Sequence, residues 1–242
     1  IIAHVDHGKT TLVDELLKNG ISTTVFLRKG SGRNDRVKDS FSGELASGLL
    51  RIEYVSLEEL SGYAMSRNTQ DMQTYASQDL LTKAAGGADT AVFYHLGWSG
   101  TFGEQRNNAD MQQKNVEYAL DAVRLAKRLG CVHFIGVGSQ AEYGRFEGRL
   151  TPDTRTLPEN EYGMAKLAAG IRSAELCREL GLRHSWVRVL SVYGPFDGRN
   201  TMIMSVIRGL LSGERVALTK GEQIWNYLYS GDAARALFML GD

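Results

Sequence analysis

Five short apolar runs, each bounded by polar or turn-forming residues, constrain the fold of this 242-residue chain more than any other feature. Runs of this length are typical of strands buried on both faces of a sheet. They are TTVFL at 23–27, RIEYV at 51–55, TAVFYHL at 90–96, VHFIGVG at 132–138 and HSWVRVL at 184–190. Because helical patterns separate the last three runs, the sequence predicts an α/β fold with a doubly wound parallel sheet.

The helical patterns are amphipathic, and each ends at a glycine. Apolar residues recur at helical spacing before Gly130 and again before Gly181. Glycine just past the last periodic residue is a common helix stop. The signals are weaker elsewhere: residues 30–50 are rich in Gly and Ser and predict a loop, and residues 61–88 predict a loop or a surface helix.

Composition and charge exclude several classes of protein. Lys and Arg number 28 and Asp and Glu number 28, so bulk charge does not hold the chain on nucleic acid. The sequence has no signal-peptide pattern, and no apolar run approaches the roughly 20 residues of a membrane helix. The two cysteines lie in predicted buried elements without metal-ligand spacing, which indicates core thiols, no metal site and a reducing, cytoplasmic location.

The chain begins with a phosphate-loop pattern, AHVDHGKTTLVDELL. Gly8, Lys9 and Thr10 fit the end of G-x-x-x-x-G-K-[ST], in which backbone N–H groups and the lysine surround phosphate oxygens, whereas Ala3 replaces the first glycine. Residues 1–17 therefore resemble the P-loop of translational GTPases. Since the guanine-reading Asn-Lys-x-Asp element is absent from the sequence, a P-loop GTP-binding protein is an alternative rather than the main hypothesis.

Tyr162 and Lys166 form a Y-x-x-x-K pair on the helix predicted before Gly181. The spacing of four residues places both side chains on one helix face. A nearby ammonium stabilises a phenolate, so we expect Lys166 to lower the pKa of Tyr162 and make it a usable acid–base group. Ser139 follows the strand at 132–138, where its hydroxyl can hold a substrate oxygen beside the tyrosine.

Five segments, in order along the chain, carry a resemblance to a known family. They are ADTAVFYHLG at 88–97, SQAEYG at 139–144, YGMAK at 162–166, SVYGP at 191–195 and WNYLYSGDAARA at 225–236. Over residues 18–242 the chain resembles the extended short-chain dehydrogenase/reductase family, the NAD(P)-dependent sugar epimerases and dehydratases. The resemblance implies a Rossmann-like NAD(P)-binding domain over residues 1–190, with an atypical first turn, and a small, truncated substrate-binding region over residues 191–242.

The resemblance also implies a reaction, which is hydride transfer between a nicotinamide cofactor and a carbon of a sugar. Tyr162 would donate or accept the proton of a sugar hydroxyl, and Lys166 would also bind the nicotinamide ribose. Ser139 would hydrogen-bond the reacting oxygen. The implied substrate is a small molecule, a sugar nucleotide, and the residues implied to contact it are Ser191, Asn226 and Tyr227.

Further residues are implied to contact NAD or NADP. The residues implied in the later part of the chain are Leu96, Gly97, Asn115, Tyr162 and Lys166, and Asn115 is expected to open the helix that follows the fourth strand. Gly8, Lys9 and Thr10 occupy the place of the family's glycine-rich turn. Arg28 and Lys29 follow the strand at 23–27 and favour NADP slightly over NAD, because two cations suit its 2′-phosphate.

The atypical first turn leaves alternatives open. The family has T-G-x-x-G-x-x-G where this chain has AHVDHGKTTL, so a catalytically inactive Rossmann module is a second alternative. The sequence does not distinguish an epimerase from a dehydratase or a reductase. Many relatives dimerise through the helices that correspond to residues 109–130 and 160–180, and the resemblance therefore implies a homodimer.

Overall fold

The structure, a computed structural model, describes residues 9–28, 34–65, 91–195, 197–198, 201–222 and 224–242. Gly8 and Lys29, two of the expected cofactor residues, lie outside these ranges. The side chain of Lys9 also lies outside the description, although its backbone begins the first helix.

All five strands expected from the sequence are confirmed to within two residues at either end. Strands β1 (Thr23–Leu27) and β2 (Leu50–Tyr54) pair in parallel, with Val25 opposite Ile52. Strands β3 (Val92–His95), β4 (His133–Ser139) and β5 (Arg183–Val189) form a second parallel group in the order β3-β4-β5. The carboxyl ends of β3 and β4 therefore lie side by side, which is where ligands bind in sheets of this kind.

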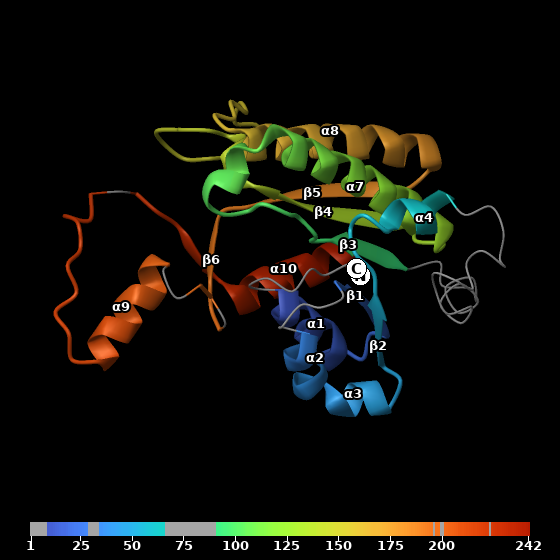
Figure 1. The fold of residues 1–242 in the computed structure, drawn as a ribbon, viewed down its shortest axis with the longest axis horizontal. Helices are drawn as coiled ribbons and strands as arrows, with labels where there is room; N and C mark the ends of the chain where they lie inside the picture. The colour runs from blue at the N-terminus through green and yellow to red at the C-terminus, as the bar shows by residue number, and fades with distance from the viewer. Residues whose placement is uncertain (1–8, 29–33, 66–90, 196, 199–200, 223) are drawn as a thin grey trace.

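Helices cover both faces of these strands (Figure 1). Helices α7 (Ala109–Arg128) and α8 (Glu161–Leu180) lie together on one face, with α4 (Leu60–Met65) against α7. Helices α1 (Lys9–Lys18) and α10 (Ser230–Gly241) pack against each other on the opposite face. The expected doubly wound α/β fold is thus confirmed.

The alternation of side chains along the strands explains the two layers. Phe93 and Phe134 face α7 and α8 and belong to the cluster that contains Val123 and Leu125. Their chain neighbours Tyr94 and Ile135 face the other way and pack with α1 and α10. The strands are apolar on both faces because both faces are covered.

Capping residues fix the ends of the two long helices. Helix α7 begins after Asn108, whose Oδ1 accepts the N–H of Met111 at 3.0 Å, so the expectation that Asn115 opens this helix was wrong. Helix α8 begins after Asn160, which accepts the N–H of Gly163 at 2.8 Å, and ends at Gly181 with a φ of 68°. An Asn side chain is among the preferred N-caps, and a left-handed glycine is the common C-terminal stop.

The loop expected over residues 30–50 was wrong for its described part. Residues 34–46 form two short helices, α2 (Asn34–Ser40) and α3 (Ser42–Ala46). Val37, Phe41 and Leu45 are spaced by four residues, and all three pack on the cluster beneath β1 and β2. Burial of this apolar stripe outweighs the low helix propensity of the surrounding Gly and Ser residues.

The segment that begins at Leu60 is a helix, but it is not a surface helix. Leu60 is 1% exposed and Tyr63 is 6% exposed, and both belong to the core cluster beside α7. The rest of the expected loop or surface helix, residues 66–88, lies outside the described residues.

The C-terminal segments complete the description. Strands β6 (Ser191–Tyr193) and β7 (Tyr227–Tyr229) form a separate parallel pair, and helix α9 (Met202–Leu211) lies between them in the chain.

Among the described helices, none combines the length and the apolar character needed to cross a membrane. Within the same residues no group of three His, Cys, Asp or Glu side chains is arranged to hold a metal ion.

The cysteines are core thiols, as the sequence indicated. Cys177 is fully buried and Cys131 packs against the same cluster, and neither forms a disulfide. Burial raises the pKa of the Cys177 thiol to about 12, so this thiol is not ionised at neutral pH.

Two histidines make the stability of the fold depend on pH. Burial lowers the pKa of both His184, which bonds Ser173 at 2.9 Å, and His133, which bonds Ser185 at 2.9 Å. The unfolded chain takes up protons at the ordinary pKa of about 6.5, whereas the folded chain takes them up only at lower pH. The free energy of unfolding is therefore expected to be highest above about pH 6.5 and to decrease at lower pH.

Urea unfolding between about pH 7.5 and pH 5.5 measures this dependence. In the double variant His133→Gln/His184→Gln, the free energy of unfolding is expected to depend less on pH than in the wild type, because the variant lacks both titrating imidazoles. An unchanged slope in the double variant would show that other groups cause the acid sensitivity.

Candidate active site

The expected catalytic residues meet at the carboxyl end of β4. Ser139 is the last residue of β4, and Tyr162 and Lys166 lie in the first two turns of α8. Between them runs a short 3₁₀ turn, η2 (Gln140–Glu142), which packs against α8. A Cβ at Gly163 would collide with the carbonyl oxygen of Ala141, so glycine at this position lets the start of α8 approach η2.

Tyr162 is held in a polar environment that shifts its pKa in both directions. Burial raises the pKa of the phenol, and this is the largest effect. A hydrogen bond with the Ser139 side chain and the positive charge of Arg106 lower it, while the charge of Glu142 raises it. The net shift is upward, so the bare site favours the protonated phenol.

Lys166 is buried directly beneath this site. Its Nζ donates to the carbonyl oxygen of Val137 at 2.7 Å and lies 3.8 Å from the ring centre of Trp98. The distance from Nζ to the ring centre of Tyr162 is 6.0 Å. The pair therefore shares one helix face, as expected, but the cation that lowers the pKa of Tyr162 in the structure is Arg106.

Arg106 was not anticipated from the sequence. It lies in η1 (Gly103–Asn107), the 3₁₀ turn before α7, and its guanidinium carbon is 4.5 Å from the ring centre of Tyr162. The ring of Trp98 is nearly perpendicular to the same tyrosine ring, with centroids 6.2 Å apart. No short motif links Arg106 to a tyrosine 56 positions later, so only the folded structure brings them together.

Two buried amides of α7 hold the segment that carries Trp98 and Arg106. Gln112 accepts the indole N–H of Trp98 at 2.9 Å and donates to the carbonyl oxygens of Gly100 and Gln105 at 2.9 and 3.0 Å. Asn115 accepts the Ser99 N–H and donates to the Ser99 carbonyl oxygen, both at 2.9 Å. Both side chains are 1% exposed, so these bonds are shielded from water.

The Asn115 side chain thus has a structural role in the described residues. Its amide is engaged by the backbone of the segment after β3, which also contains Leu96 and Gly97. It orients the part of the chain that the resemblance assigns to the cofactor. A direct contact between Asn115 and the cofactor stays a prediction.

The remaining expected residues occupy three places. Thr10 lies in the first turn of α1, and Arg28 is the exposed residue that follows β1. Ser191 and Tyr227 are direct partners in the register of β6 and β7, and exposed Asn226 immediately precedes Tyr227. The three residues expected to bind the substrate are therefore brought together, although Ser191 lies 35 positions before Asn226 in the chain.

The polar groups at the end of β4 are of the kind that a nicotinamide ribose requires. An ammonium has three N–H donors, and a phenol both donates and accepts. Lys166 and Tyr162 present these groups from adjacent turns of one helix, and Gly97, after β3, has no side chain to obstruct a ligand. The types of residue present therefore fit a nicotinamide dinucleotide.

Parallel strands with helices on both faces, and polar groups gathered at their carboxyl ends, define a Rossmann-like α/β protein. Residues 10–242 match the sequence model of the NAD dependent epimerase/dehydratase family, and the chain belongs to that family. The match begins at Thr10, so it gives no support to the GTPase resemblance of residues 1–17.

Two of the solved structures with a similar fold are sugar-nucleotide epimerases. A UDP-glucose 4-epimerase from Thermotoga maritima, solved with UDP-glucose, is 18% identical with a TM-score of 0.73, over 99% of this chain and 71% of that chain. A UDP-glucuronic acid 4-epimerase from Bacillus cereus, solved with NAD, is 16% identical with a TM-score of 0.71, over 99% and 72%.

A third similar structure is a dehydratase. The dTDP-glucose 4,6-dehydratase from Bacillus anthracis, solved with NAD, is 15% identical with a TM-score of 0.73, over 99% of this chain and 69% of that chain. At these identities the likeness establishes a shared fold. No curated protein sequence matches the chain significantly.

Replacing Arg106 by Met tests the electrostatics of the site. The variant loses the positive charge above the Tyr162 ring, so the pKa of Tyr162 is expected to rise. Tyrosinate absorbance measures this pKa when each titration is compared with the same protein carrying Tyr162→Phe. Arg106→Lys should restore part of the effect, and Arg145→Met removes an exposed arginine paired with Glu159 as a control. An unchanged pKa in Arg106→Met would show that the guanidinium is displaced in solution.

Proposed function

We propose that the protein is an NAD(P)-dependent epimerase, dehydratase or reductase that acts on a sugar nucleotide or a related hydroxyl or carbonyl substrate by hydride transfer. The family membership supports the class of enzyme. The observation that carries the proposal is the packing of the start of α8, which carries Tyr162 and Lys166, against the carboxyl end of β4, where Ser139 lies.

In the proposed reaction Tyr162 holds and moves the proton. Oxidation of a sugar alcohol removes the hydroxyl proton to the Tyr162 oxygen and a hydride from the same carbon, which leaves a carbonyl. The bound nicotinamide ring supplies the hydride acceptor and, in the return step, the donor. Return of the proton from Tyr162 to the carbonyl oxygen completes the opposite step.

Neighbouring side chains make this proton transfer accessible. Ser139 donates a hydrogen bond to the reacting oxygen and stabilises the charge that develops there. Arg106 stabilises the phenolate by its positive charge, against the cost of burial, and Lys166 is proposed to bind the nicotinamide ribose. Trp98, fixed by Gln112, excludes water from the side of the site nearest Lys166.

The proposed cofactor is NADP or NAD, with NADP slightly favoured. Arg28 is exposed directly after β1, where a cation suits a 2′-phosphate. Several similar structures were solved with NAD, and they support NAD as the alternative cofactor. We further propose that Ser191, Asn226 and Tyr227 contact the nucleotide part of the substrate.

The wider setting is also a proposal. The assignment of residues 1–190 to the cofactor and 191–242 to the substrate follows the family resemblance. A homodimer through α7 and α8 and a cytoplasmic location follow from the same resemblance and from the two core thiols.

Tyr162→Phe tests the acid–base role. The variant keeps the ring and its contacts but cannot carry the proton, so turnover with sugar nucleotides should fall at least about 100-fold while NADPH binding persists. Tyr118→Phe removes a hydroxyl from α7, away from the site, and should leave turnover unchanged. Wild-type activity that survives Tyr162→Phe would refute the mechanism, and a wild type that binds the cofactor without turning over any substrate would favour the inactive module.

Cofactor choice is tested by fluorescence titration with NADPH, NADH and magnesium-GTP. NADPH is expected to bind most tightly, and GTP is expected not to displace it. Arg28→Ala should weaken NADPH binding by about tenfold and leave NADH binding unchanged, as loss of one charge-assisted hydrogen bond predicts. Arg155→Ala, at an exposed position in another loop, is the control. Saturable GTP binding without NADPH binding would support the P-loop alternative instead.

A further inference from the structure

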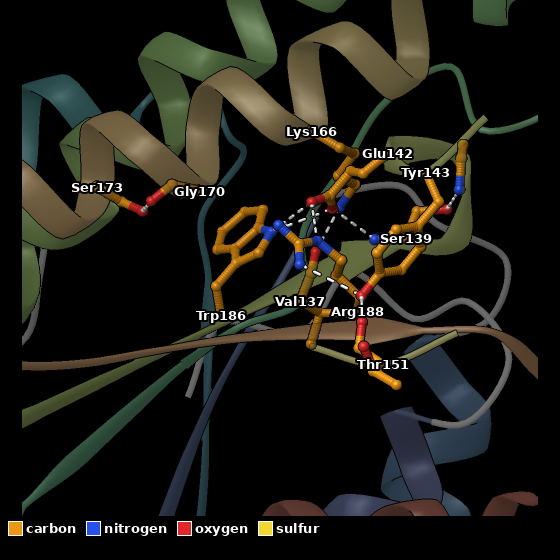
Figure 2. A network of polar contacts seen from close by, with 11 residues as sticks. Val137, Ser139, Glu142, Tyr143, Thr151, Lys166, Gly170, Ser173, Trp186 and Arg188 are labelled. Atoms are coloured by element: carbon orange, nitrogen blue, oxygen red, sulfur yellow. Dashed lines mark hydrogen bonds and ion pairs between the residues drawn. The ribbon is translucent and has the colours of Figure 1, made fainter. Parts of the chain in front are cut away.

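A fully buried carboxylate lies next to the site and has no part in the mechanism above. Glu142 ends the η2 turn, and its side chain is 0% exposed. Figure 2 shows Trp186 and Arg188 from β5 and the backbone of Ser139 from β4 converging on this carboxylate. A buried carboxylate is costly unless its oxygens are well bonded, so its presence here requires an explanation.

The Glu142 oxygens are bonded on three sides. Oε1 accepts the Ser139 N–H at 2.8 Å, and Oε2 accepts Nε of Arg188 at 2.6 Å. The indole N–H of Trp186 lies 3.1 and 3.2 Å from the two oxygens. The carboxylate therefore ties the end of β4 to the side chains of β5.

The same turn fixes the Ser139 side chain. Its Oγ accepts the N–H of Ala141 at 3.2 Å, while Glu142 takes the N–H of Ser139 itself, and the two bonds form a capping box. The capping box fixes the position of Oγ, which already accepts one bond and keeps its proton free to donate. The orientation of the catalytic hydroxyl thus depends on the bond between Glu142 and the Ser139 backbone.

The residues around Glu142 leave space for its carboxylate and hold its ion-pair partner in place. A Cβ at Gly138 would collide with Oε1 of Glu142 and with Nε1 of Trp186, so β4 has room for the carboxylate only because this residue is glycine. Arg188 is itself held by the Tyr143 hydroxyl at 3.3 Å, and that hydroxyl donates to the Thr151 carbonyl oxygen at 3.3 Å. The cation that fixes Glu142 is therefore fixed in turn.

We propose that Glu142 is the positioning residue for Ser139, and that its carboxylate, oriented by Arg188 and Trp186, holds the Ser139 hydroxyl against Tyr162. The proposal rests on the proposed function for its effect on turnover. It makes Glu142 act through Ser139 and gives it no contact with the substrate or the cofactor.

A matched pair of double variants tests this role. Glu142→Gln/Arg188→Met and Glu142→Leu/Arg188→Met both remove the buried charges, and they differ in whether position 142 can accept the Ser139 N–H. Replacing both members of a buried ion pair avoids leaving one charge unpaired. We expect the Gln variant to keep kcat within about fivefold of the wild type, and the Leu variant to fall about 100-fold, to the level of Ser139→Ala, with a smaller change in KM. Equal kcat values in the two double variants would overturn the proposal.

A second measurement does not depend on turnover. The pKa of Tyr162 should be higher in the Leu variant than in the Gln variant, because the Ser139 hydrogen bond that lowers it is lost, while neither variant carries the Glu142 charge. Adding Ser139→Ala should raise the pKa in the Gln variant and change it little in the Leu variant. Equal pKa values of Tyr162 in the two double variants would overturn the positioning role. Unequal pKa values, together with no turnover in any of the proteins including the wild type, would refute the proposed function alone.

Two controls separate positioning from stability. Leu125→Ala opens a cavity in the core, away from the site, and should lower the unfolding temperature without lowering kcat. Gly138→Ala keeps both charges but displaces the carboxylate, so it should lower kcat and raise the pKa of Tyr162, as the Leu variant does. This variant decides the matter if the Leu variant does not fold, and wild-type values in a folded Gly138→Ala protein would contradict the proposal.

Discussion

The arrangement of the site depends on the bond between the Lys166 ammonium and the carbonyl oxygen of Val137. This bond links α8 to β4 at the point where the strand ends, and it lies in a buried environment where a charged donor is strong. The strand brings Ser139 to the edge of the sheet, and the helix brings Tyr162. A shift of α8 along β4 would separate the two hydroxyls, so the geometry of the proposed chemistry follows from the packing of one helix on one strand.

A second constraint comes from α7, which supports an otherwise exposed turn. The residues around Arg106 have little apolar surface to bury, and their own contacts would not fix them. The buried amides of Gln112 and Asn115 supply the missing bonds by pairing with backbone groups of this segment. The turn therefore has a defined position although it has no hydrophobic core of its own. Its Arg106 side chain is held over the ring of Tyr162.

The sequence predicts the parts of this protein that follow from local pattern. Short apolar runs predict the buried strands, and the places of Ser139 at a strand end and of Tyr162 on a helix follow from the same local pattern. Arg106 and Glu142 could not be assigned, because their roles depend on contacts between segments far apart in the chain. The two short helices on either side of Phe41 were missed for a related reason: their stability comes from burial against β1 and β2 and not from their own composition.

The two indoles beside the site give it a spectroscopic signature. Trp98 is buried over the Lys166 ammonium, and the N–H of Trp186 is bonded to the Glu142 carboxylate, whereas Trp225 is 54% exposed. The emission of an indole depends on the charge and the water around it, so the two indoles at the site emit in surroundings unlike those of the third. Intrinsic fluorescence therefore reports from two positions at the site, and the chain carries its own optical probe of whether its site is assembled.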